Sequence, residues 1–132
     1  MSYSILVVDD SPLIRKMMKR SLGLSKLELG TVFEATNGKE ALALLEKEWI
    51  DVVLADIHMP VMTGTELIEL MSRDKLLGKI PVIVVSAERS EPAIEHLKKL
   101  GICANLQKPF TPEQVLEVIQ KVLQEAAARA HA

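Results

Sequence analysis

An alternation between short apolar runs and helical stripes constrains the fold of this sequence more than any other feature. Five runs have the length and composition of β-strands, at residues 4–8, 31–35, 51–55, 81–87 and 103–107. The first, third and fourth runs are almost continuously aliphatic, as expected of strands that are covered on both faces. The second and fifth runs are weaker, which suits strands at the edges of a sheet.

Stripes of apolar residues at helical spacing follow each of these runs. They lie within residues 12–22, 37–49, 67–71, 94–100 and 111–123. The last stripe has the clearest start signals, because Thr111 can cap a helix, Pro112 suits the first helical position and Gln114 completes a capping box. Strand and helix therefore alternate five times, which predicts an α/β fold: a doubly wound parallel sheet with helices on both faces.

Length and composition describe an ordinary globular chain. Its 132 residues suit one domain, and only 3% of them are aromatic, so aliphatic side chains must fill the core. We expect this domain to occupy residues 1–125, with no output domain attached. Residues 126–132 have no visible apolar face, so we expect them to form a short tail that frays.

Charge and cysteine content exclude several classes of protein. A net charge of −2 gives no reason to expect nucleic acid or an anionic membrane as a partner. No apolar stretch reaches the roughly 18 residues that cross a bilayer, and the N-terminus lacks the pattern of a signal peptide. The single cysteine, Cys103, excludes an internal disulfide, and we expect it to be a buried thiol. The cytoplasm is the expected location.

Polar residues stand at the ends of four of the five predicted strands. Asp9 and Asp10 end the first run, Asp56 follows the third, Ser86 lies in the fourth and Lys108 follows the fifth. Each has an ordinary explanation by itself: a helix cap, a turn residue, a small polar residue or a solvated charge. In an open parallel sheet, however, ligands bind at the carboxyl ends of the strands. We therefore expect these five side chains to meet at one edge of the sheet.

The combination indicates phosphoryl chemistry with a metal ion. Two carboxylates such as Asp9 and Asp10 oppose each other by about 4 kcal/mol at roughly 4 Å, so a nearby cation is expected. Clustered carboxylate oxygens suit Mg²⁺. A carboxylate can also attack a phosphoryl group, and the metal, Lys108 and the Ser86 hydroxyl could stabilise the aspartyl phosphate that results. The sequence has no glycine-rich phosphate loop, and no second histidine is spaced to join His58 in a zinc site.

Four motifs, in this order and spacing, resemble the receiver domain of two-component response regulators, particularly the single-domain type represented by the chemotaxis regulator. The motifs are ILVVDDSPLIRK, DVVLADIHMPVMTG, PVIVVSA and KPF, and the resemblance runs from about residue 3 to residue 124. It implies a flavodoxin-like fold with five helices and with five strands in the order 2-1-3-4-5, an order for which the chemotaxis regulator is itself a usual example.

The resemblance also implies which residues bind the metal. Asp56 would be the phosphoacceptor and a metal ligand. Asp9 and Asp10 would be the acidic pair that holds Mg²⁺, or Mn²⁺ in its place, directly or through water. The backbone carbonyl of His58 would complete the protein ligands.

Further residues would act on the phosphoryl group by the same resemblance. Ser86 would be the switch hydroxyl that approaches it, and Lys108 would pair with its oxygens. Pro109 follows Lys108 at the position where the family usually has a cis peptide bond. His58 and Glu88 would flank the mouth of the site, at positions that tune the lifetime of the phosphorylated state.

One position departs from the family pattern. Many receivers carry Tyr or Phe three residues before the motif lysine, and this sequence has Asn105 there. The aromatic side chain whose inward rotation reports phosphorylation is therefore absent. A relay through the last two helices and the last strand, which the resemblance implies as the docking face, would have to work without it.

The function implied by the resemblance is a stand-alone phosphorylation switch rather than an enzyme. A sensor histidine kinase or a phosphotransfer protein would phosphorylate Asp56, and the modification would change the affinity for a downstream protein. We expect a monomer or a weak phosphorylation-dependent dimer, with no nucleic-acid partner and no insertion into a membrane.

Two alternatives stay open at this point. A receiver-like module could bind its partner without phosphate, which Asn105 favours and the complete acidic and basic set argues against. An aspartyl-nucleophile phosphohydrolase would usually show two aspartates separated by one residue. Here Asp9 and Asp10 are adjacent and are followed by Ser11, so this alternative ranks below the receiver.

Overall fold

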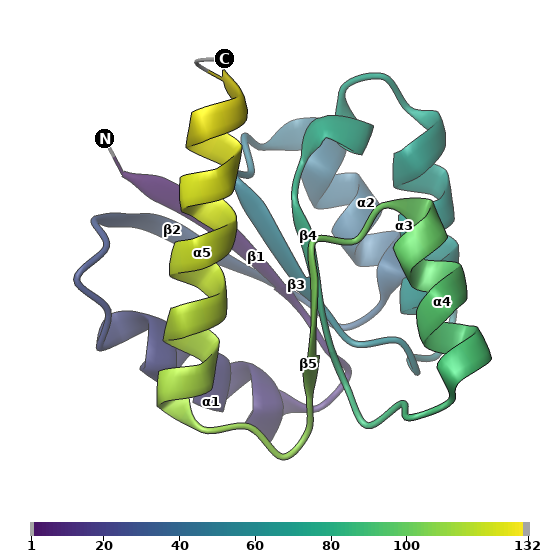
Figure 1. Cartoon of the computed structure of the whole chain (residues 1–132), viewed down its shortest axis with the longest axis horizontal. Helices are drawn as coiled ribbons and strands as arrows, with labels where there is room; N and C mark the ends of the chain where they lie inside the picture. The colour runs from purple at the N-terminus through teal and green to yellow at the C-terminus, as the bar shows by residue number, and fades with distance from the viewer. Residues whose placement is uncertain (1, 131–132) are drawn as a thin grey trace.

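The computed structural model describes residues 2–130 and shows a five-stranded parallel sheet with helices on both faces (Figure 1). The strands are β1 (Tyr3–Val8), β2 (Leu29–Ala35), β3 (Val52–Ala55), β4 (Val82–Ser86) and β5 (Ala104–Gln107). They stand in the order β2-β1-β3-β4-β5, and every neighbouring pair is parallel. The expected fold class and strand order are confirmed, and the two weaker apolar runs form the edges.

Five helices cover the two faces of this sheet. Helices α1 (Pro12–Gly23) and α5 (Pro112–Ala130) lie on one face, and α2 (Gly38–Lys47), α3 (Gly64–Arg73) and α4 (Glu91–Leu100) lie on the other (Figure 1). A single turn of 3₁₀ helix, η1 (Leu77–Lys79), precedes β4. None of the helices in the described part of the chain is long and apolar enough to cross a membrane.

Two apolar layers, one on each face of the sheet, form the core. In β1, Ile5 and Val7 pack in the layer under α1 and α5, whereas Leu6 and Val8 pack in the layer under α2, α3 and α4. Every residue of β3 and β4 is buried as well. Full burial of an aliphatic side chain of this size stabilises the fold by about 1.5–3 kcal/mol, which explains why these strands lack the usual polar alternation.

Side-chain caps start several helices just beyond the ends of the strands. The Ser11 side chain accepts a hydrogen bond from the backbone of α1, and Thr63 and Glu66 form a capping box at the start of α3. The capping box expected for α5 is present. The Thr111 N–H donates to Gln114 Oε1 over 2.8 Å, and the Gln114 N–H donates to Thr111 Oγ1 over 3.2 Å. These caps orient the loops that carry the polar strand-end residues.

Two local features differ from what the sequence predicts. Cys103 is only partly buried and precedes β5 instead of lying within it, because the sheet edge leaves this position partly open. Residues 126–130, expected as a frayed tail, continue α5, since their alanine-rich sequence favours a helix even without a core face. The last two residues of that tail, 131 and 132, lie outside the described residues.

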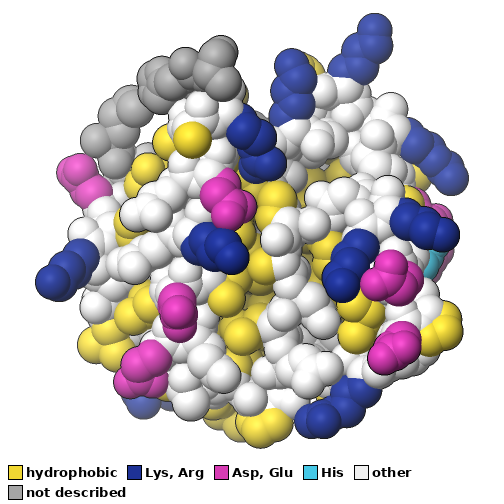
Figure 2. Space-filling model, viewed as in Figure 1, with side chains coloured by type: hydrophobic (Ala, Val, Ile, Leu, Met, Phe, Trp, Pro, Cys, Tyr) yellow, Lys and Arg dark blue, Asp and Glu magenta, His cyan; other side chains and the backbone are white. Residues whose placement is uncertain are grey.

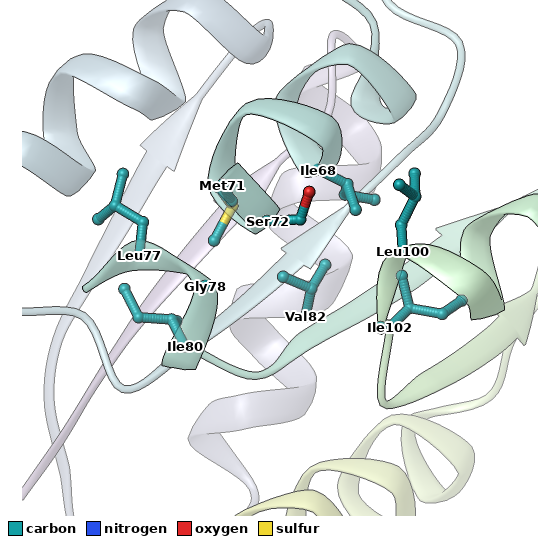
Figure 3. A pocket seen from close by; sticks show the side chains of 10 residues that line it. Ile68, Met71, Ser72, Leu77, Gly78, Ile80, Val82, Leu100 and Ile102 are labelled. Carbon is teal, nitrogen blue, oxygen red and sulfur yellow. The ribbon is translucent and has the colours of Figure 1, made fainter. Parts of the chain in front are cut away.

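A small apolar cavity lies where α3, the start of β4 and the end of α4 meet. In Figure 3, Ile68 and Met71 of α3 lie on one side of it and Val82 and Ile102 on the other. Its volume is about 20 Å³, which is room for about one water molecule. Only Leu97 of α4 is fully buried in the core. Helix α4 therefore buries fewer of its side chains than α3 does.

Candidate functional site

Three carboxylates converge at the carboxyl edge of the sheet. Asp9 and Asp10 follow β1 and Asp56 follows β3, and these two strands are parallel neighbours whose ends are in register. One oxygen atom from each carboxylate lies within 4.8 Å of the others. Asp9 is fully buried and Asp56 is only 7% exposed, whereas Asp10 faces solvent. The structure therefore brings together the acidic residues that the strand ends predict.

Asp9 is held by hydrogen bonds on every side. Its Oδ1 accepts from the Ser11 N–H over 2.9 Å, and its Oδ2 accepts from Lys108 Nζ over 2.8 Å. Its backbone carbonyl accepts from Arg15 Nη1 over 2.7 Å. The other side of the Arg15 guanidinium binds Glu34 in β2. A buried carboxylate needs such partners, because an unpaired one would lose several kcal/mol of solvation.

Lys108 brings its ammonium group into the acidic cluster from the far end of the sequence. Its Nζ lies 2.8 Å from Asp9 Oδ2 and 3.3 Å from Asp56 Oδ2. The backbone N–H of Lys108 donates to the Ser86 carbonyl over 2.9 Å, and the peptide bond to Pro109 is cis, as expected. Burial lowers the pKa of Lys108, but the Asp9 and Asp56 carboxylates outweigh it and hold that pKa above its ordinary value. Lys108 therefore stays cationic.

The surroundings of Asp56 raise the pKa of its carboxyl group. Burial raises the pKa of Asp56, the Lys108 charge opposes that rise, and the Asp9 charge adds to it, so the pKa lies above the ordinary value. Asp56 Oδ1 accepts a hydrogen bond from the Ile57 N–H over 2.8 Å. Burial therefore makes the ionised form of Asp56 less favourable than that of a carboxylate in water.

Close packing of the next loop fixes the position of Asp56. The Gly64 N–H at the start of α3 donates to the Ile57 carbonyl over 2.8 Å. A Cβ at position 64 would collide with the backbone carbonyl of Asp56. Glycine is therefore required where α3 turns back against the strand end.

Ser86 and two further side chains lie around the mouth of the site. Ser86 is buried at the end of β4, and its Oγ accepts from the Glu88 N–H over 3.1 Å. Exposed His58 and half-buried Glu88 form a hydrogen bond of 3.0 Å between Nε2 and Oε2, which joins the loop after β3 to the loop after β4. Hydrogen bonds from the Ser90 N–H and from His58 hold the pKa of Glu88 below its ordinary value.

The cluster has the donors and the charge that suit a divalent cation. Three carboxylates and one ammonium leave a net charge of −2. All the convergent donors are carboxylate oxygens, which Mg²⁺ and Mn²⁺ prefer and which Zn²⁺ sites seldom use alone. The arrangement therefore fits a hard divalent ion.

Sequence reasoning missed two contributors to this site. Arg15 lies in the first motif, but nothing in its spacing indicates that its guanidinium reaches back to the Asp9 carbonyl. The close approach of Gly64 to Asp56 was also missed, although a glycine eight residues after a strand-end aspartate is a usable signal.

Comparison with known proteins shows which family this chain belongs to. The family model described as the response regulator receiver domain matches residues 5–120. This chain belongs to the response regulator receiver domain family. A chemotaxis protein CheY homolog of Campylobacter jejuni is 36% identical over 120 residues, which span 90% of this chain and 91% of that protein.

Solved structures agree with the family assignment. The chemotaxis response regulator CheY4 of Vibrio cholerae superposes with a TM-score of 0.83 at 34% identity, over 92% of this chain and 99% of that one. A CheY-like receiver domain protein from Methanospirillum hungatei superposes with a TM-score of 0.88 at 31% identity, over 98% and 99% of the two chains. This protein is a CheY-like receiver, a signalling module of the two-component type.

The departure at Asn105 also has a structural counterpart. Asn105 lies in β5 opposite Val84 of β4. Its Oδ1 and the Ser25 Oγ are buried, and within the described part of the chain neither atom has a hydrogen-bond partner. A buried amide oxygen without a partner costs about 1–3 kcal/mol. The position that many receivers fill with an aromatic ring thus holds an unpaired polar atom in this structure.

Proposed function

We propose that this protein is a phosphorylation switch that accepts a phosphoryl group on Asp56 and thereby changes its affinity for a downstream protein. The donor is a sensor histidine kinase or a phosphotransfer protein. The observation that carries the proposal is the convergence of Asp9, Asp10 and Asp56 around the Lys108 ammonium, which bonds to two of them. Such a set binds a phosphoryl group and positions a nucleophile in one place.

The metal site in this proposal uses the three carboxylates and one main-chain group. Asp9, Asp10, Asp56 and the backbone carbonyl of His58 would hold Mg²⁺, or Mn²⁺ in its place. When bound, the ion supplies positive charge to the oxygens of the transferring phosphoryl group.

The remaining steps use the side chains around Asp56. An Asp56 oxygen attacks phosphorus in line, an acyl phosphate P–O bond forms, and the P–N bond to the donor imidazole breaks, with the imidazole keeping the electron pair. Lys108 Nζ, already 3.3 Å from Asp56 Oδ2, stays within reach of the phosphoryl oxygens. The Ser86 oxygen accepts a hydrogen bond from the Glu88 N–H, which leaves its own proton free to donate to a phosphoryl oxygen.

The face formed by α4, β5 and α5 is the proposed docking surface for the downstream protein. Figure 2 shows this face with acidic and basic side chains of both signs spread over it and apolar side chains exposed between the helices. A surface without a single-sign patch suits a protein partner rather than nucleic acid or a membrane. Because only Leu97 of α4 is fully buried, a two-state change in the position of α4 would disturb little of the core.

The remaining features of the proposal rest on the same family membership. The receiver domain comprises residues 1–125, and residues 126–132 are a short tail, of which residues 126–130 extend α5. The protein acts in the cytoplasm as a monomer or a weak phosphorylation-dependent dimer. Its process is of the chemotaxis type, as the names of its relatives suggest.

A small phosphodonor tests the chemistry without the kinase. With acetyl phosphate and Mg²⁺, intact-mass spectrometry should show one added phosphoryl group, and removal of the ion by a chelator should abolish it. Asp56→Asn should show none. Asp51→Asn, which changes an aspartate at the opposite end of the sheet, is the matched control and should be phosphorylated normally.

Two outcomes would contradict the proposal. Phosphorylation of Asp56→Asn would show that the acceptor is another residue. Turnover of a phosphate ester that survives Asp56→Asn and disappears in Asp9→Asn would assign the chain to aspartyl-nucleophile phosphohydrolases.

A receiver-like module that binds without phosphate is the second candidate, because Asn105 replaces the usual aromatic side chain. Beryllium fluoride, a mimic of the phosphoryl group, separates the two functions. In the switch, amide NMR signals of α4, β5 and α5 should shift with the mimic, and Asp56→Asn should show no shift. Changes limited to the loops around Asp56 would favour the phosphate-independent module.

A further inference from the structure

An apolar groove lies at the amino end of the sheet, opposite the acidic cluster. The segment that links α2 to β3 forms one wall, and the segment from the end of α3 through η1 to β4 forms the other. The groove has a volume of about 540 Å³. Its apolar lining includes Trp49, Ile50, Leu76, Leu77, Ile80 and Pro81. The groove is therefore a feature of the fold that the phosphorylation site does not use.

Two large apolar side chains at this groove are almost fully exposed. Trp49 is 81% exposed and Leu76 is 76% exposed. A single exposed apolar residue is normal on a protein surface, but two of this size at one concave site indicate a binding surface. Tryptophan in particular is enriched among the residues that dominate the energy of protein interfaces.

Hydrogen bonds within the chain hold the Trp49 ring and the backbone at Leu76 in place. The Trp49 indole N–H donates to Asp51 Oδ1 over 3.1 Å, so the polar edge of the ring is satisfied and its apolar face remains available. The Asp74 carboxylate accepts from the backbone N–H groups of Leu76 and Leu77 over 2.9 and 3.0 Å. An ordered site of this kind loses little conformational entropy when it binds.

The charged residues that line the groove are mostly acidic. They are Glu46, Glu48, Asp51 and Asp74, against Lys79 as the one cation of the lining. Glu46 and Glu48 have no side-chain hydrogen bond or ion pair within the described residues, and both remain free to meet a cation. Lys47 and Lys75 are neighbours in the sequence but do not line the groove. An apolar floor with an acidic rim favours an occupant that is apolar and basic.

We propose that this groove is a second docking site, which binds a segment of a partner protein that presents apolar anchor residues flanked by Lys or Arg. A second copy of this chain that met the groove through the same face would bring acidic rims together, and like charges disfavour that contact. The groove and Asp56 lie at opposite ends of β3, so docking here does not depend on phosphorylation. The receiver would then be held by one partner while it signals to another.

The sequence contains a single tryptophan, so the emission of Trp49 reports on the groove directly. The probe is a synthetic amphipathic peptide with a leucine stripe flanked by lysines, and its matched control has glutamate in place of every lysine. The lysine peptide should shift the emission of Trp49 to shorter wavelength in a saturable way, and added salt should weaken its binding. The glutamate peptide should leave the emission unchanged.

Variants that retain Trp49 locate the binding site. Leu76→Ser should weaken binding of the lysine peptide at least tenfold, and so should the double variant Glu46→Lys with Glu48→Lys. Leu24→Ser, at an equally apolar position that is 66% exposed after α1, is the control for Leu76→Ser and should bind normally. The same charge reversal at Glu117 and Glu125 of α5 is the control for the double variant.

Three results would overturn the proposal. The first is an equal effect of the two peptides on the emission of Trp49, and the second is equal peptide binding by the groove variants and their controls. The third is an emission shift that depends on protein concentration without peptide, which would make a second copy of the chain the occupant. Asp56→Asn should bind the lysine peptide as the native protein does. The docking site and the phosphorylation proposal can therefore fail separately.

Discussion

The carboxyl end of the sheet buries charged side chains, whereas the amino end exposes apolar ones. At the carboxyl end, Asp9 and Asp56 are charged groups withdrawn from water and held by fixed hydrogen bonds and by Lys108. At the amino end, Trp49 and Leu76 are apolar groups left in water. Both ends depart from the usual rule of apolar inside and polar outside. The site for chemistry and the proposed docking site both lie where the fold departs from this rule.

The strongest test of the carboxyl end is Gly64→Ala. The added Cβ would meet the Asp56 carbonyl, a backbone atom that cannot move without displacing β3, so we expect a loss of about 3 kcal/mol in the free energy of unfolding. Urea denaturation measures it. Gly23→Ala at the end of α1 meets no atom within 4 Å and should be neutral or slightly stabilising. Equal stability of both variants would show that the Asp56 loop is not tightly packed.

Removing the Asp56 charge should stabilise the metal-free protein. Because the folded pKa of Asp56 is raised, its ionised form costs stability, and that cost appears as pH rises through the folded pKa. Asp56→Asn should therefore raise the free energy of unfolding by about 1–2 kcal/mol at pH 7 in chelator, because it removes a buried charge. The gain should vanish below the ordinary carboxyl pKa and should shrink when Mg²⁺ stabilises the native protein.

Asp74 at the amino end should affect the pH dependence of stability in the opposite way to Asp56. Hydrogen bonds from the Leu77 and Leu76 N–H groups hold its pKa below the ordinary value. Its contribution to stability is present above the unfolded pKa and is lost as pH falls through the folded pKa. Asp74→Asn should therefore lower stability at neutral pH, opposite in sign to Asp56→Asn. Thermal melts of both variants across pH test this, and equal signs would contradict the comparison.

A smaller effect is expected at Val61, in the loop after β3. Val61 is exposed and has φ of 69°, a left-handed conformation that a β-branched residue seldom adopts. Val61→Asn should raise the free energy of unfolding by about 1 kcal/mol, because asparagine tolerates this conformation. Val61→Thr keeps the branched Cβ and should show no gain. Equal stability of both variants would show that the loop stores no backbone strain.

The smallest effect should come from the amino end itself. Trp49→Ala should change the free energy of unfolding by less than about 0.5 kcal/mol, because the exposed ring contributes little to the core. Chemical denaturation followed by circular dichroism measures this without the tryptophan signal. A loss of several kcal/mol would make Trp49 a structural residue and would remove the contrast between the two ends.

Much of the fold and of the acidic site could be predicted before the structure, since both follow from local patterns. Continuous aliphatic runs indicate strands covered on both faces, and the helical stripes between them require crossover connections. The position of Asp9, Asp10 and Asp56 at strand ends then follows from parallel topology. The apolar run predicts a deeper burial for Cys103 than the structure shows, because burial at a sheet edge depends on how far the neighbouring helices extend.

By itself, the sequence determined where strands and helices form and which polar residues stand at the strand ends. These properties follow from hydrophobic periodicity and from capping residues, which act within a few positions along the chain. Only the tertiary structure decided the Lys108–Asp9 contact across 99 positions, the support of the Asp9 carbonyl by Arg15, and the joint exposure of Trp49 and Leu76 at one groove. Such contacts depend on how separate segments pack in space, which periodicity does not encode.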